Sequence, residues 1–74
     1  MLQTYTIVWT HADGRQNVSL TTWSDDETAI SDCALAFRGD LASIALGRGT
    51  EANGVQWLGA WDLCAGKPVW TPAE

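Results

Sequence analysis

A turn signal at Asp13-Gly14, with alternating apolar and polar residues on both sides, constrains the fold of this chain most. Asp-Gly between such segments is typical of a two-residue type I′ turn, which joins adjacent antiparallel strands. With these two residues as the loop, Trp9 is predicted to face Val18 and Ile7 to face Leu20. This register gives the hairpin one apolar face and one face of Thr and Ser, the pattern of a half-buried strand pair.

A second turn signal, Asn53-Gly54, predicts another hairpin later in the chain. The segment from Leu41 to Arg48 alternates in hydrophobicity and is predicted to pair with the segment from Val55 to Cys64. A two-residue loop would place Leu46 opposite Trp61, so pattern and turn agree here too.

Between the hairpins, the sequence predicts a helix from about Asp25 to Arg38, followed by Gly39 in the C′ position. Ser24 and Glu27 have the spacing of a capping box, with Ser24 as the N-cap. At 100° per residue, one helix face is predicted to lie on the sheet and comprises Ile30, Cys33, Ala34 and Phe37. The opposite, outward side comprises Asp25, Thr28, Asp32 and Leu35.

The last predicted strand is Val69 to Thr71, and Pro68 places it at an edge or a strand start because proline has no N–H to donate. The predicted order is therefore two strands, one helix and three strands. A single α+β domain over residues 1–74 follows, with one antiparallel sheet of about five strands and the helix packed on one face.

Five tryptophans are more indole than the core of a 74-residue chain needs. Trp9, Trp57 and Trp61 have the parity of the apolar face and are predicted to pack beneath the helix. Trp23 has the parity of the Thr and Ser face, and either packs at the corner between sheet and helix or stands exposed in a contact patch. Trp70 either closes the core or is available to a partner. Tryptophan is enriched at binding hot spots, which favours a binding module.

The formal net charge of −5 disfavours direct binding to nucleic acid or to an anionic membrane, because both attract basic surfaces. A host protein or ribonucleoprotein complex with a basic surface is the better electrostatic match. The start of the chain has no signal-peptide pattern, and no apolar run is long enough to span a membrane. We therefore expect a soluble, cytoplasmic protein.

The residues that could carry catalysis or bind a metal are few. His11 is the only histidine, is predicted to be solvated beside the turn, and has no nucleophile in a recognised context. Cys33 and Cys64 lack metal-ligand spacing and are predicted to be buried free thiols. Cys33 is predicted to point from the helix toward the sheet and Cys64 to lie on the strand face away from the helix, which disfavours a bridge between them. The sequence predicts no enzyme activity, no cofactor and no metal site.

In size, charge, lack of catalytic residues and sheet-plus-helix plan, the chain resembles the small acidic inhibitors of phages and mobile elements, notably anti-CRISPR proteins. The resemblance implies a non-enzymatic protein that blocks a host nucleic-acid-handling complex through an acidic and aromatic surface. The residues predicted to form this protein-binding surface are Trp23, Asp25, Asp26, Asp32 and Leu35. The alternative is a homodimeric or assembly-forming structural protein that uses a sheet edge or sheet face.

Overall fold

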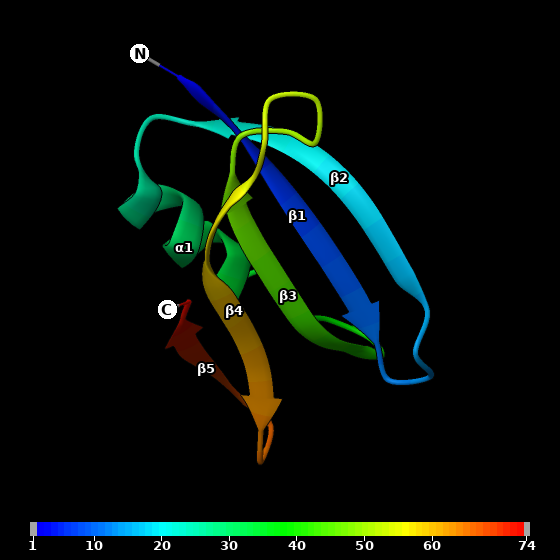
Figure 1. The fold of residues 1–74 in the computed structure, drawn as a ribbon. Helices are drawn as coiled ribbons and strands as arrows, with labels where there is room; N and C mark the ends of the chain where they lie inside the picture. The colour runs from blue at the N-terminus through cyan, green and yellow to red at the C-terminus, as the bar shows by residue number, and fades with distance from the viewer. Residues whose placement is uncertain (1, 74) are drawn as a thin grey trace.

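A computed structural model describes residues 2–73 and contains one antiparallel sheet and one helix (Figure 1). The sheet has five strands in the order β2-β1-β3-β4-β5, so the predicted α+β fold is confirmed. The elements in chain order are β1 (Gln3–His11), β2 (Gln16–Trp23), α1 (Asp26–Ala34), β3 (Leu41–Arg48), β4 (Gln56–Cys64) and β5 (Lys67–Pro72).

Helix α1 connects β2 to β3 and packs on one face of the sheet (Figure 1). Its small residues Ala29 and Cys33, one turn apart, are buried against the strands. The other buried apolar residues come from β1 and β3, and comprise Tyr5, Ile7, Leu41, Ile44 and Leu46. Ile30 and Phe37 pack at the margin of this core as expected, whereas Ala29 rather than Ala34 is fully covered.

The first hairpin has a loop of three residues rather than the predicted two, so the pairing of β1 with β2 differs from the prediction by one residue. The His11 N–H donates to the Arg15 carbonyl and the Gly14 N–H donates back to the His11 carbonyl, at 2.8 and 2.9 Å. Gly14 has a φ of 92°, the left-handed conformation that ends a type I turn with a bulge. Val8 therefore pairs with Val18, and Ile7 pairs with Ser19.

A one-residue change of register moves each side chain of a strand to the other face. Val18 and Leu20 consequently lie on the face opposite the helix, where they are 60% and 59% exposed. Trp23 moves the other way and shares the helix face with Tyr5, contradicting its predicted place on the Thr and Ser face. The Trp23 indole and the Tyr5 phenol ring meet edge to face, with their centroids 5.5 Å apart.

In the second hairpin β3 has the predicted bounds, but the pairing differs from the prediction by two residues. Ile44, rather than Leu46, lies opposite Trp61, and a shift of two leaves Trp61 on the helix face. A bulge then intervenes, because Leu46 pairs with Gly59 while Gly47 pairs with Trp57. Trp57 is thereby moved to the uncovered face and is 46% exposed, so its predicted place in the core is wrong.

The helix begins at Asp26, and Asp25 rather than Ser24 is its N-cap. The Asp25 carboxylate accepts a hydrogen bond of 2.8 Å from the Thr28 N–H, so the predicted capping box does not form. The helix ends at Ala34 rather than at the predicted Arg38. Its last backbone hydrogen bonds span three residues instead of four, as in the bond from the Leu35 N–H to the Asp32 carbonyl, and this tighter turn ends the α-helix.

Strand β5 is at one edge of the sheet, as Pro68 predicts, and a second proline, Pro72, ends it. Trp70 packs on the core, and its ring centroid is 5.5 Å from that of Trp61. The two cysteines are free, as predicted: Cys33 is buried, whereas Cys64 is exposed and corrects the expectation that both thiols are buried.

Replacing Gly59 with alanine tests the bulge. A Cβ there would lie 2.4 Å from the Thr71 carbonyl oxygen and 2.9 Å from the Pro72 Cα, and the φ of 152° is one that alanine rarely adopts. We expect Gly59→Ala to lower the free energy of unfolding by roughly 2–4 kcal/mol, from overpacking and backbone strain together. Urea denaturation followed by tryptophan fluorescence measures this loss.

The matched control is Gly14→Ala, which also has a positive φ but meets no atom within 4 Å of the added Cβ. It should cost about 1 kcal/mol from backbone conformation alone. Equal losses in the two variants would contradict the close approach of β5 to Gly59.

Candidate functional site

Asp26, one of the five predicted binding residues, connects the start of α1 to two strands. The Tyr5 hydroxyl of β1 donates to one Asp26 carboxylate oxygen at 2.7 Å. The Arg48 guanidinium, at the end of β3, donates to both oxygens of the same carboxylate. Asp26 is thus held by charge-assisted bonds within the fold, and its carboxylate is only partly exposed.

The same contacts shift the pKa values of Asp26 and Tyr5 in opposite directions. Hydrogen bonding to Arg48, and then to Tyr5, lowers the pKa of the Asp26 carboxyl. Burial, reinforced by the hydrogen bond to Asp26 and by its negative charge, raises the pKa of Tyr5 to about 12. Asp26 therefore accepts as a carboxylate, and Tyr5 donates as a neutral phenol.

The other predicted binding residues also lie near α1, and three of them have internal hydrogen bonds. Asp25 caps the helix, and the Asp32 carboxylate accepts a bond of 2.7 Å from the Trp23 indole N–H. Trp23 packs at the sheet–helix corner, one of its two predicted placements. Leu35 is 79% exposed and points away from the core, as predicted.

A second candidate surface is the sheet face that α1 does not cover, which we call the open face. Register and strand alternation assign to it the even-numbered residues of β1 and β2, and the set Ser43, Ala45, Gly47, Trp57, Ala60, Asp62, Cys64, Lys67, Val69 and Thr71 on the other strands. Val18, Leu20, Trp57 and Val69 are its large exposed apolar residues. The sequence prediction placed the first three of these in the core.

Two hollows lie on the open face. One, of about 470 Å³, is bounded by Thr6, Val18, Leu20 and the loop residues Thr50, Glu51 and Ala52. The Thr6 hydroxyl donates to the Gly49 carbonyl at 2.7 Å, which holds this loop over β1. The other, of about 390 Å³, has a floor of small residues, including Ala45, Gly59 and Ala60, beside the Trp57 ring.

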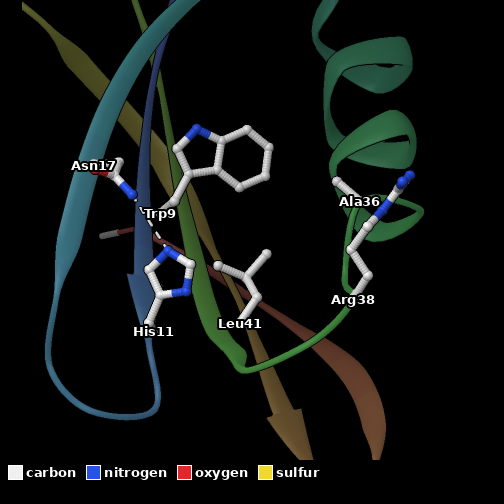
Figure 2. Close-up of a pocket in the computed structure, with 6 residues that line it drawn as sticks. All are labelled: Trp9, His11, Asn17, Ala36, Arg38 and Leu41. Atoms are coloured by element: carbon white, nitrogen blue, oxygen red, sulfur yellow. Dashed lines mark hydrogen bonds between the residues drawn. The ribbon is translucent and has the colours of Figure 1, made fainter.

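A third concave site, the helix-end pocket, lies where the chain leaves α1. Figure 2 shows Trp9, His11 and Asn17 on the sheet side, and Ala36 and Arg38 on the side of the helix end. Leu41 lies between the two sides, and the pocket has a volume of about 380 Å³.

His11 is held in this pocket by hydrogen bonds, contrary to the prediction that it is solvated. Its Nδ1 is 2.8 Å from an Asp40 carboxylate oxygen, and its Nε2 is 3.3 Å from the Asn17 amide nitrogen. The Asn17 NH₂ donates to Nε2, so the neutral ring carries its proton on Nδ1 and donates to Asp40. Neither partner carries a hydroxyl or thiol group that His11 could activate by removing a proton.

The remaining groups that could carry chemistry are the metal-binding side chains and the cysteine thiols. No group of three or more His, Cys, Asp or Glu side chains within residues 2–73 could hold a metal ion. Burial, and then the nearby Asp32 charge, raise the pKa of the Cys33 thiol to about 11, so this thiol stays protonated at neutral pH.

Tyr5→Phe tests the contacts of Asp26 through pH. The folded-state pKa of Tyr5, about 12, lies above its ordinary value of 10.0, so its contribution to stability is present below pH 10 and is lost as pH rises from 10 to 12. The variant should lose about 1 kcal/mol at pH 7, from the missing hydrogen bond, and should lack the loss due to Tyr5 at high pH. Urea denaturation at pH 7 and 11 measures both effects.

Tyr5 is the only tyrosine, so tyrosinate absorbance of the wild-type protein titrates this group alone. A midpoint at pH 10 in the folded protein would contradict the contact with Asp26.

Comparison of the chain with known proteins identified no relative: no family model, no curated protein and no solved structure matches it. The resemblance to anti-CRISPR inhibitors therefore stays a prediction. A search of residues 2–73 for a helix with the length and apolar character to cross a membrane found none.

Proposed function

We propose that this protein is a non-enzymatic protein-interaction module that pairs with a second copy of itself through the open face. The observation that carries the proposal is the exposure of Val18, Leu20, Trp57 and Val69 on a sheet face without a covering layer. Two sheets commonly bury such faces against each other about 10 Å apart. Val18 and Leu20 lie on the edge strand β2, Val69 lies on the opposite edge strand β5, and Trp57 lies on β4, so exposed apolar side chains occur across the width of this face. Exposed apolar surface marks interaction sites.

The size of the open face suits a dimer. A rectangle with the two longest extents of the molecule, 35 and 23 Å, covers roughly 800 Å² in projection, which sets an upper bound on the open face. This bound is comparable with the area of about 800 Å² that each partner buries in a stable interface of standard size. A chain of 74 residues has a small core, and burial of a second apolar face would add to its stability.

The shape of the open face favours a second copy as the occupant. A two-fold interface needs a projection and a complementary recess on the same surface. Trp57 projects beside a hollow whose floor comes from small residues such as Ala45 and Ala60. A Cβ at Gly47 would lie 2.9 Å from the Trp57 ring, so glycine at this position leaves room for the indole on the open face.

The charge distribution also favours this pairing. Among the described strand residues of the open face, only Asp62 and Lys67 are charged. The acids of α1 lie on the other side of the sheet, so the net charge of −5 does not concentrate where two copies would meet.

Leu20→Asp tests the proposal, because a charge is costly to bury in an apolar interface. We expect the wild-type protein to elute as a dimer in size-exclusion chromatography with light scattering, and Leu20→Asp to shift the mass to that of the monomer. The matched control is Leu35→Asp, the same change at an exposed leucine on the helix side, which should stay dimeric. A wild-type monomer at millimolar concentration would refute the proposal.

A second candidate function is the cytoplasmic inhibitor of a host nucleic-acid-handling complex, which would bind a basic protein surface through the outer side of α1. The 79% exposure of Leu35, one turn after Asp32, supports it as an apolar anchor beside acidic residues. Because Asp25 and Asp26 maintain the helix start, this function rests most directly on Asp32 and Leu35.

The double variant Asp32→Lys/Leu35→Ala tests this inhibitor function without altering the helix cap. In a salt-dependent pull-down from bacterial lysate, we expect it to lose a basic nucleic-acid-binding protein that the wild-type protein retains, with roughly tenfold weaker binding of that protein once purified. The control Asp13→Lys/Leu2→Ala makes the same changes at exposed residues outside α1. Equal retention by all three proteins would exclude this surface.

A further inference from the structure

The helix-end pocket combines a flat apolar wall with a cation that has no carboxylate partner in the described part of the chain. Within residues 2–73, Arg15 and Arg48 form ion pairs with carboxylates, and His11 is hydrogen-bonded to the Asp40 carboxylate. Arg38 forms none of these pairs, is exposed, and lines the pocket together with Trp9 and Leu41. A guanidinium in this setting is available to bind a planar anion through two parallel hydrogen bonds.

The sheet side of the pocket is preorganised. The Trp9 indole N–H donates to the Ser19 hydroxyl at 2.7 Å, which fixes the orientation of the ring. The His11 ring is held by hydrogen bonds to Asp40 and Asn17. The side chains of His11 and Asn17 are therefore already ordered before a ligand binds. Side chains fixed in advance reduce the entropy lost on binding.

We propose that this pocket binds a small aromatic monocarboxylate, with its ring against Trp9 and Leu41 and its carboxylate on Arg38. The volume of about 380 Å³ is within the range of small-molecule sites. A flat ring stacks on or meets the edge of an indole favourably, and the carboxylate matches the geometry of the guanidinium.

The one acid beside the pocket does not oppose an anion. The Asp40 carboxylate contacts His11 at 2.8 Å and the Arg15 guanidinium at 3.0 Å, so its charge is largely compensated. The pocket lies on the helix side of the sheet, away from the open face, and this inference is therefore independent of self-association.

The test titrates ¹⁵N-labelled protein with indole-3-acetate as the probe and follows assigned Trp9, His11 and Asn17 signals by NMR. The comparison probe is indole-3-acetamide, which has the same ring but no charge. The test variant is Arg38→Gln, an exposed position outside regular secondary structure, and the matched control is Lys67→Gln, another basic side chain without an ion pair in the described residues.

We expect saturable shifts of the pocket signals with the carboxylate, and binding weaker by tenfold or more for both the amide and Arg38→Gln. Lys67→Gln should bind as the wild-type protein does. The proposal is overturned if no pocket signal shifts saturably up to about 10 mM probe, tenfold above a weak Kd of ~1 mM. It is also overturned if amide and carboxylate bind equally, or if the two variants lose affinity equally.

Discussion

The hydrogen bond from the Gly14 N–H to the His11 carbonyl determines which surface this molecule presents. It closes a three-residue loop, and the loop fixes the register in which β2 pairs with β1. In that register Ser19 meets the Trp9 indole on the helix side, while Val18 and Leu20 turn outward. A loop one residue shorter would exchange these roles, burying the apolar residues and exposing the polar ones.

A single short helix cannot cover both faces of a five-stranded sheet, and the tryptophans are distributed accordingly. Trp9, Trp23 and Trp61 anchor the covered face, where each indole N–H has a hydrogen-bond partner. The Trp61 bond, to the Ile30 carbonyl at 2.7 Å, joins β4 directly to the helix backbone. Trp57 alone turns to the open face. Most of the indole rings in this sequence thus pack on or beside the core, and one, Trp57, is left exposed on the open face.

Periodicity and turn signals were enough to predict the strand order in the chain, the position of the helix and the bounds Leu41–Arg48. They could not predict the register, because Asp-Gly suits both a two-residue loop and the end of a three-residue loop. Beside the bulge, Gly59 lies close to β5, which is a tertiary contact. A glycine inside a strand was the only local sign of it in the sequence. The partners of Asp26 were likewise out of reach, since Tyr5 and Arg48 are 21 and 22 residues away in sequence.

The two edges of the sheet differ in their capacity to bind another strand. On β5, Pro68 and Pro72 have no N–H to offer, whereas β2 contains no proline. An incoming strand can therefore extend the sheet beyond β2 more readily than beyond β5. If two copies join through their β2 edges, the resulting ten-stranded sheet has a proline-containing strand at each end. Pairing of this kind would stop at two copies, because each outer strand then contains prolines, and it would give a closed pair rather than a growing fibre.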